Sequence, residues 1–111
     1  MKLIKKDDGE IYEAKRHFGY WAMRKVVPER DSKRLNIGLS HFLPQGGAEM
    51  SSSPLERVYY CIAGSLLVKG KAEEHLLEPG DLLYIAAGEE REFQAQGTEP
   101  ATILVIMTQV D

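Results

Sequence analysis

The stretch ERVYYCIAGSLLVKGKAEEHLLEPGDLLYIAAGEEREF, residues 56–93, decides the fold class. Short runs of β-branched, aromatic and leucine residues alternate in it with turns containing glycine or proline, at intervals of roughly 8 to 12 residues. The run SLLVKGKAEEHLL predicts a hairpin that turns near Gly70, and EPGD predicts a tight turn. This spacing is typical of a sandwich or barrel of antiparallel strands.

Further strands are predicted on both sides of this stretch. The final apolar run is predicted to be covered on both faces, and the PQGG segment at residues 44–47 is interpreted as a turn. No linker or change of composition divides the chain, so we expect one all-β domain over residues 1–111, closed as a barrel or jelly roll. Besides the hairpin, the predicted strands are residues 18–27, 35–43, 57–63, 81–88, 91–96 and 101–110.

The composition excludes several classes of protein. A net charge of −3 indicates no surface for nucleic acid. The N-terminus lacks the apolar region of a signal peptide, and no run reaches the roughly 18 to 20 apolar residues of a membrane span. The single cysteine, Cys61, cannot form an internal disulfide, which fits a reducing compartment. We therefore expect a cytoplasmic protein that binds neither nucleic acid nor membrane.

Residues 35–108 resemble the cupin superfamily, small jelly-roll barrels defined by two motifs. The second motif, G-x5-P-x-G-x2-H-x3-N, begins here at Gly80 and reaches Gly88 with the family's spacing. The 15 residues between Gly64 and Gly80 match the short inter-motif segment of small single-domain cupins, and residues 11–27 add N-terminal strands. The resemblance implies the fold alone, because cupins include dioxygenases, isomerases, epimerases, lyases, sugar-binding regulators and storage proteins.

The four positions that hold a metal in other cupins carry different residues in this chain. The resemblance places Ser51 and Ser53 at the two histidine positions of the first motif, Arg57 at its glutamate position, and Arg91 at the histidine position of the second. Transition metals are bound by imidazole and carboxylate groups, whereas a guanidinium is positive and has no lone pair to donate. We therefore expect no cofactor at the usual site, and a transition metal would need ligands recruited around His41.

The resemblance implies that Arg57 and Arg91 converge inside the mouth of the barrel. Two guanidiniums in a partly desolvated cavity repel each other, so a negative group is expected between them. A carboxylate or phosphate ligand would meet this need by accepting bidentate hydrogen bonds. Alternatively, Arg91 extends to the rim, or the protein's own acids supply the charge. The acids close in sequence are Glu49, Glu56, Glu89, Glu90 and Glu92.

Other polar and aromatic side chains are candidates for lining the same cavity. Two serines offer hydrogen bonds to a ligand oxygen, and Tyr59 is a donor or weak acid. A cysteine in this pattern is more typical of a buried core than of a nucleophile. His17 and His75 are interpreted as exposed residues, whereas His41 shares a strand face with four apolar residues. Beyond the two arginines, the candidates are His41, Met50, Ser51, Ser53, Tyr59, Cys61, Tyr84 and Phe93.

Three functions follow from these residues. The first is a metal-independent cupin, either a binding protein or a non-redox enzyme, that holds a small anionic molecule through Arg57 and Arg91. The second is a metal-dependent enzyme, dioxygenase-like or lyase-like, with a site around His41. The third is a structural or regulatory module that associates with itself. The resemblance also implies a homodimer, for which residues 18–23 and 102–107 offer apolar surface.

Overall fold

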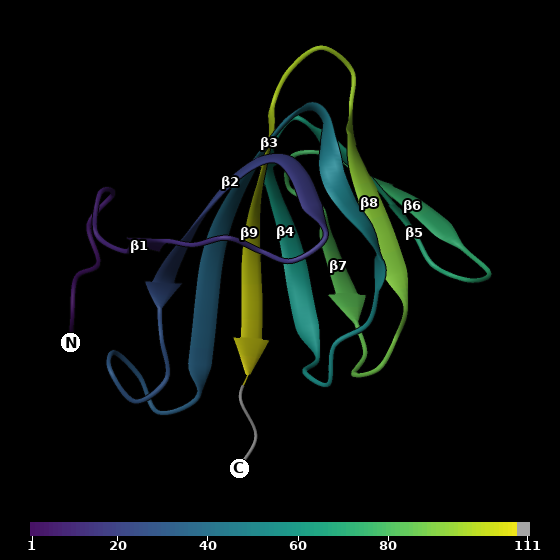
Figure 1. Cartoon of the computed structure of the whole chain (residues 1–111). Helices are drawn as coiled ribbons and strands as arrows, with labels where there is room; N and C mark the ends of the chain where they lie inside the picture. Colours follow the sequence, from purple (N-terminus) through teal and green to yellow (C-terminus); the bar gives the residue numbers. More distant parts are fainter. Residues whose placement is uncertain (109–111) are drawn as a thin grey trace.

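Strand β3 (Leu35–Ser51) is the long strand to which the rest of the barrel is added in the computed structural model (Figure 1). It pairs with β2, β8 and β9, and all the pairings between strands are antiparallel. The structure describes residues 1–108. In them the other strands are β1 (Glu10–Ile11), β2 (His17–Val26), β4 (Arg57–Ala63), β5 (Ser65–Lys69), β6 (Glu74–Leu77), β7 (Leu82–Ile85), β8 (Arg91–Gln96) and β9 (Ala101–Thr108).

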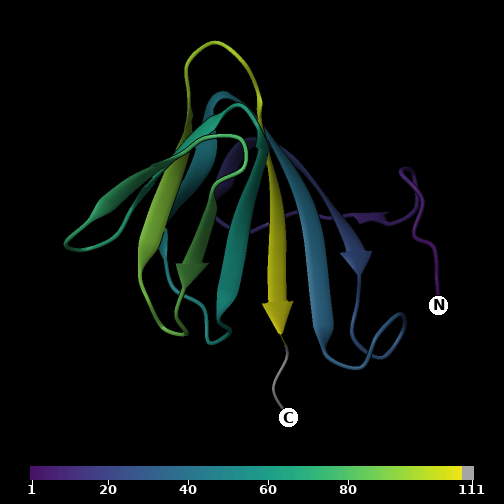
Figure 2. The same cartoon turned by 180° about the vertical axis from the view of Figure 1, so that it is seen from behind.

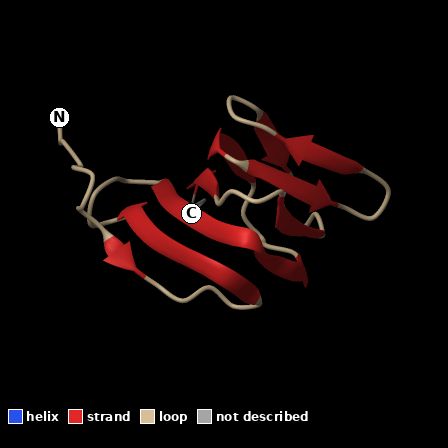
Figure 3. Ribbon diagram, turned by 90° about the horizontal axis from the view of Figure 1, so that it is seen from above, coloured by secondary structure: helices blue, strands red, loops and turns tan. Residues whose placement is uncertain are grey.

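The strands form two facing layers that β3 joins. Hydrogen-bonded neighbours follow the order β6-β5-β8-β3-β9-β4-β7, with β2 beside β3 and β1 beside β2. Seen from behind, β9 lies between β3 and β4 (Figure 2), and the view from above shows the layers on either side of the interior (Figure 3). The described residues hold no helix long and apolar enough to cross a bilayer. The prediction of an all-β jelly-roll barrel is confirmed.

The PQGG segment, residues 44–47, belongs to β3, so the predicted turn there is wrong. Gln45 has a φ of 71°, and the register of β3 shifts against its neighbours, so the strand bends without ending. A Cβ atom at Gly47 would overlap the carbonyl oxygen of Phe93 on β8. Position 47 requires glycine because β3 and β8 approach each other closely there. This glycine therefore marks a contact between strands and not a turn.

The turns predicted in the second half of the chain are present. Gly70 donates its N–H to the Glu73 carbonyl at 2.8 Å in the hairpin between β5 and β6. In EPGD, the N–H of Asp81 donates to the Glu78 carbonyl at 2.9 Å, and the Asp81 carboxylate accepts the Glu78 N–H at 2.9 Å. The predicted final strand extended to residue 110, and its last two residues lie outside the described part of the chain.

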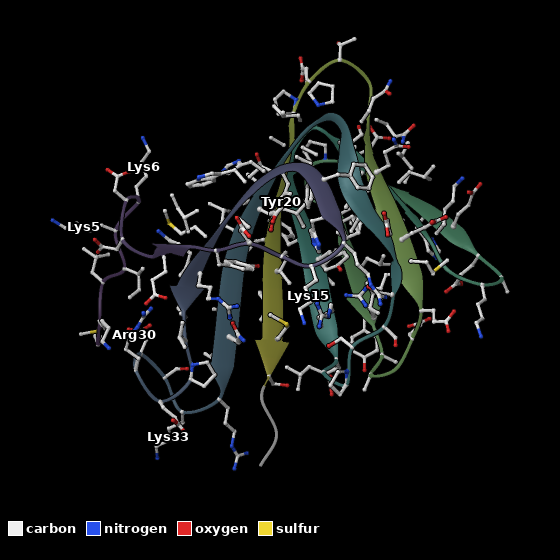
Figure 4. All side chains as sticks on the ribbon, viewed as in Figure 1. Lys5, Lys6, Lys15, Tyr20, Arg30 and Lys33 are labelled. Carbon is white, nitrogen blue, oxygen red and sulfur yellow. The ribbon has the colours of Figure 1, made fainter. Side chains whose placement is uncertain are left out.

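The chain between β1 and β2 crosses the open side of the barrel in front of β9 and β4 (Figure 1). We call residues 12–16 the crossing segment. Hydrogen bonds fix it to β2: the Tyr12 N–H donates to the Ala22 carbonyl at 3.1 Å, and the Ala14 N–H donates to the Tyr20 hydroxyl at 2.7 Å. Figure 4 labels Lys15 on this segment and Tyr20 on β2. The crossing segment therefore covers part of the barrel interior.

Substitution of Gly47 by alanine is expected to destabilise the protein by more than about 2 kcal/mol, because the new methyl group has no space beside the Phe93 carbonyl. Gly70→Ala is the matched control, since its Cβ would meet other atoms only at ordinary contact distances. The control is expected to change the unfolding free energy by no more than about 1 kcal/mol. Urea denaturation measures both, and equal effects of the two substitutions would contradict the close approach.

Candidate functional site

A cavity of about 220 Å³ opens into the barrel beneath the crossing segment. Its apolar wall comes from β3, β5, β8 and β9, and its polar groups come from the crossing segment, β2 and β4 as well as from β3 and β8. Three arginines, two tyrosines, a histidine and a serine make up the polar part. The lining residues are Tyr12, Ala14, His17, Arg24, Ser40, Phe42, Arg57, Tyr59, Leu66, Arg91, Phe93, Ile103, Val105 and Met107.

Arg91 and Arg57 meet at the hydroxyl of Tyr59. Arg91 is 9% exposed, and its Nε donates to the Tyr59 hydroxyl at 3.3 Å while its Nη1 donates to the Ser51 carbonyl at 3.2 Å. Arg57 precedes Tyr59 by two residues on β4, so both side chains point to the interior. The Nε of Arg57 is buried and has no hydrogen-bond partner in residues 1–108. The convergence that the resemblance implied is thus present in the structure.

The electrostatic environment of Arg57 is unfavourable. Burial lowers the pKa of this guanidinium, and the positive charge of Arg91 lowers it further, while the hydrogen bond and partial charge of Tyr59 act in the opposite direction. An arginine side chain remains charged under all ordinary conditions, so it cannot relieve this cost by losing a proton. The cavity therefore holds unneutralised positive charge.

A third guanidinium extends the positive surface toward the crossing segment. Arg24 on β2 lies over the ring of Tyr12, with its Cζ 4.3 Å from the ring centroid. Burial raises the pKa of the Tyr12 phenol, although the charge of Arg24 opposes this shift. The ring of Tyr12 in the crossing segment thus packs against an arginine that also lines the cavity.

No acidic side chain of residues 1–108 forms an ion pair with Arg24, Arg57 or Arg91. The nearby acids are engaged elsewhere: Glu90 pairs with Lys71 at 3.8 Å, Glu89 accepts the Ala86 N–H at 3.0 Å, and Glu56 hydrogen-bonds Tyr84. Glu49 and Glu92 line a separate groove of about 250 Å³ on the outer surface, together with Lys69. Internal pairing of the arginines, one of the alternatives from the sequence, is therefore absent from the described chain, and burial of Arg91 excludes its extension to the rim.

Four predicted site residues line the cavity, and two more surround it. Arg57, Tyr59, Arg91 and Phe93 face the interior. Ser51 contributes its main-chain carbonyl to Arg91, and Ser53 caps its own turn, since its hydroxyl accepts the N–H of Leu55 at 3.2 Å. Neither serine hydroxyl belongs to the cavity lining.

His41, Tyr84 and Met50 lie outside the cavity, contrary to expectation. His41 alternates along β3 with the inward-facing Phe42, so its ring lies on the outer face. Its centroid is 5.2 Å from that of Trp21, with the two rings tilted by 36°, and its Nδ1 is hydrogen-bonded to the Thr102 hydroxyl at 3.0 Å. Tyr84 is 56% exposed on β7, and Met50 is 37% exposed. The alternation predicted for these strands is correct, but the apolar face of β3 was assigned to the interior and is the outer one.

Cys61 is fully buried in the core below the cavity and does not line it. Its thiol donates weakly to the carbonyls of Ala63 at 3.6 Å and Gly64 at 3.5 Å. Burial raises the pKa of the thiol, and the carboxylates of Asp81 and Glu78 raise it further. Its environment thus favours the neutral thiol and agrees with the interpretation as a core residue.

Sequence reasoning missed Tyr12, His17, Arg24 and Ser40, all of which line the cavity. His17 and Arg24 reach the same side because β2 contains a bulge at Gly19, where φ is 58° and the register with β3 shifts. A regular alternation would place His17 and Arg24 on opposite faces. A glycine inside an aromatic strand was the available signal of this bulge.

The residues of this cavity do not fit a transition metal. Three guanidiniums repel a cation, and in residues 1–108 no three His, Cys, Asp or Glu side chains gather closely enough to bind one. His17 is the single imidazole in the lining, while His41 lies on the outer face and His75 pairs with Glu73 at 3.5 Å. The chemistry of the site is that of hydrogen-bond donation to negative charge.

Comparisons with known proteins agree with this fold. Residues 38–107 match the family model described as cupin domain. A Mycobacterium tuberculosis protein named beta-D-galactosidase is 31% identical over 106 residues, which are 95% of this chain and 91% of that protein. The polyketide cyclase RemF from Streptomyces resistomycificus superposes with a TM-score of 0.83 at 16% identity, over 97% of this chain and 79% of its own. A cupin-like protein from Thermotoga maritima has a TM-score of 0.80 at 17% identity, over 96% and 82%. The two structures are similar in fold.

Replacement of Arg57 by methionine is expected to raise the unfolding free energy of the ligand-free protein by about 1 kcal/mol, because the substitution removes a half-buried, unneutralised charge and keeps most of the volume. Urea denaturation at pH 7.5 measures the change. The control is Arg30→Met, whose side chain pairs with Glu10 and Asp31 on the surface and is expected to leave stability nearly unchanged. A clear loss of stability in Arg57→Met would show that the protein itself compensates this charge.

Proposed function

This chain belongs to the cupin domain family, and we propose that it binds an anionic small molecule, a carboxylate or a phosphate, in the barrel through Arg57 and Arg91 without a metal. One observation carries the proposal: the cavity contains three guanidiniums, and no carboxylate of residues 1–108 lies in its lining or pairs with them. An anion that enters the cavity would replace water around guanidiniums that form no ion pair with a carboxylate of residues 1–108. The same site suits either a binding protein or an enzyme of non-redox chemistry.

The geometry favours recognition of the anion over a merely diffuse attraction. Arg91 is held by Tyr59 and by the Ser51 carbonyl, so its position is fixed before a ligand arrives. Arg57 has an unsatisfied Nε beside it, and Arg24 lies over the ring of Tyr12. Guanidiniums bound in fixed orientations pair with planar oxyanions through parallel hydrogen bonds, which are stronger than bonds between neutral groups.

The other functions considered from the sequence receive less support. The metal-dependent alternative was centred on His41, which lies on the outer face beside Trp21. The self-associating module was expected to fill its barrel with its own side chains, whereas a cavity of about 220 Å³ is present.

The name of the mycobacterial relative raises glycoside hydrolysis as a second candidate. Most enzymes of that kind use two carboxyl groups, one as acid and one as base or nucleophile, on opposite sides of the bond that breaks. The cavity lining contains no aspartate or glutamate among the described residues. A sugar that carries its own acidic group fits the guanidiniums better than a neutral glycoside does.

The proposal is tested by ligand-induced thermal stabilisation. Millimolar carboxylates and inorganic phosphate are expected to raise the melting temperature of the wild type, because they bind the folded protein only. Arg57→Met and Arg91→Met are expected to lose most of this increase while remaining folded. Differential scanning fluorimetry at constant ionic strength measures the shifts.

Two controls separate this effect from general salt effects and from a bound metal. Arg30→Met is expected to keep the full response, since Arg30 is on the surface and ion-paired with Glu10. Pretreatment of the untagged protein with a chelator is expected to leave the response unchanged. Equal stabilisation of the wild type and both cavity variants would refute the proposal, and loss of the response after chelation would favour a metal.

We also propose that the chain forms a homodimer through the outer face of the layer β2-β3-β9-β4-β7. Several large apolar side chains are exposed together on this face, and exposed apolar patches often mark surfaces of association. Those more than a third exposed include Trp21, Leu35, Leu43, Tyr60, Ile62, Leu82 and Tyr84.

Light scattering coupled to gel filtration tests the dimer. The wild type is expected at twice the mass of one chain, and Ile62→Lys is expected to shift it toward the monomer because the charge would be buried in the interface. Leu76→Lys is the matched control, since Leu76 is 50% exposed on β6, away from this face. A monomeric wild type at micromolar concentration would contradict the proposal.

A further inference from the structure

The hydrogen-bonding groups of the cavity are strongly biased toward donation. A guanidinium has N–H groups and no acceptor, so Arg24, Arg57 and Arg91 can bind only lone pairs of a ligand. The Tyr59 hydroxyl already accepts from Arg91. A ligand composed of oxygen acceptors alone would therefore satisfy most of the site. The imidazole of His17 differs from this pattern.

His17 is held in one tautomer by the crossing segment. Its Nδ1 lies 2.8 Å from the main-chain carbonyl oxygen of Lys15. A carbonyl only accepts hydrogen bonds, so Nδ1 carries the proton, and in the neutral ring Nε2 carries the lone pair. Nε2 has no hydrogen-bond partner within residues 1–108. Because the two nitrogens lie on different edges of the ring, the bond to Lys15 turns Nε2 away from the crossing segment.

The surroundings of His17 keep the ring uncharged and fixed. Burial lowers its pKa from the ordinary value near 6.5, the bond to the Lys15 carbonyl opposes this, and the charges of Arg91 and Arg57 lower it further. The ring packs against three aromatic side chains, with centroid distances of 5.2 Å to Tyr20, 6.2 Å to Phe42 and 5.6 Å to Phe93. At neutral pH the ring is thus an oriented acceptor in a cavity of donors.

We propose that His17 Nε2 selects the ligand class by accepting a hydrogen bond from a hydroxyl group, so that the anion bound by the arginines is a hydroxy acid or another hydroxyl-bearing anion. This inference rests on the proposed anion site and adds a second point of recognition to it. The anionic group binds to Arg57 and Arg91, and the hydroxyl donates to His17 across the same cavity. A ligand without the hydroxyl displaces water from the cavity but leaves the Nε2 lone pair of His17 without a hydrogen-bond donor.

The remaining walls agree with a small ligand of mixed polarity. The aromatic rings of Phe42 and Phe93 and the side chains of Ile103 and Val105 line the same cavity as its polar groups. A volume of about 220 Å³ accommodates a small organic acid with an apolar body. Sites that hydrogen-bond a ligand hydroxyl reject analogues that lack it, whereas purely apolar sites discriminate weakly.

Matched pairs of acids that differ by one hydroxyl test the inference. The probes are lactate and propionate, 3-hydroxybutyrate and butyrate, and mandelate and phenylacetate, measured by isothermal titration calorimetry on the full chain at pH 7.5. For pairs that bind, the hydroxy acid is expected to bind about three- to ten-fold more tightly, as one additional hydrogen bond provides. In His17→Phe this ratio is expected to fall to about one, because phenylalanine keeps the aromatic packing and offers no lone pair.

His17→Gln provides the conservative variant, since an amide oxygen can occupy the position of Nε2. It is expected to restore part of the preference for the hydroxy acid. A purely structural role of His17 would lower the affinity for both members of a pair and leave their ratio unchanged. Binding with the same ratio in the wild type and His17→Phe, or with no preference in the wild type, would overturn the inference while the proposed anion site stands. Failure of every probe to bind the wild type would overturn both.

Discussion

The constraint on which the site depends is the placement of two guanidiniums, one buried and one half-buried, against a single phenol. Arg91 donates to Tyr59, and its positive charge adds to burial in lowering the pKa of Arg57. Repulsion between such charges in a partly desolvated cavity is of the order of a few kcal/mol. Folding must supply this energy from elsewhere, because neither guanidinium can become neutral. Binding of the proposed anion would relieve this repulsion.

The scaffold makes this burial tolerable by fixing the arginines from different strands. Arg57 projects from β4, and Arg91 begins β8, which pairs with the far half of β3. These strands converge because β3 bends at residues 44–47 and passes from one layer to the other. Gly47 permits the approach of β8 at the bend. The bend of β3 thus determines where Arg57 and Arg91, which are far apart in the sequence, come together.

Much of the fold was predictable from the sequence, whereas the composition of the site was predictable only in part. Period-two alternation placed Arg57 and Tyr59 correctly on one inner face, because β4 is regular. The same reasoning placed His41 inside, because it assumes that the more apolar face of a strand is buried, and here that face is the outer one. His17 was interpreted as an exposed residue before the first strand, whereas β2 begins at His17 and a bulge at Gly19 sets the phase that turns the ring inward. A bulge depends on contacts with β3 that sequence periodicity does not contain.

The polar residues of the cavity come from two parts of the chain, the positions that resemble the cupin motifs and the N-terminal segment with β2. The positions that resemble the cupin motifs supply Arg57 and Arg91, and so the sign of the charge that the barrel attracts. The crossing segment and β2 supply Tyr12, His17 and Arg24, which lie toward the covered side. Because electrostatic interactions strengthen as water is excluded, the covering chain would also increase the affinity of the arginines for the proposed anion. A change in the crossing segment would consequently alter both the shape recognised and the affinity, while a change in the motif positions would alter the charge recognised.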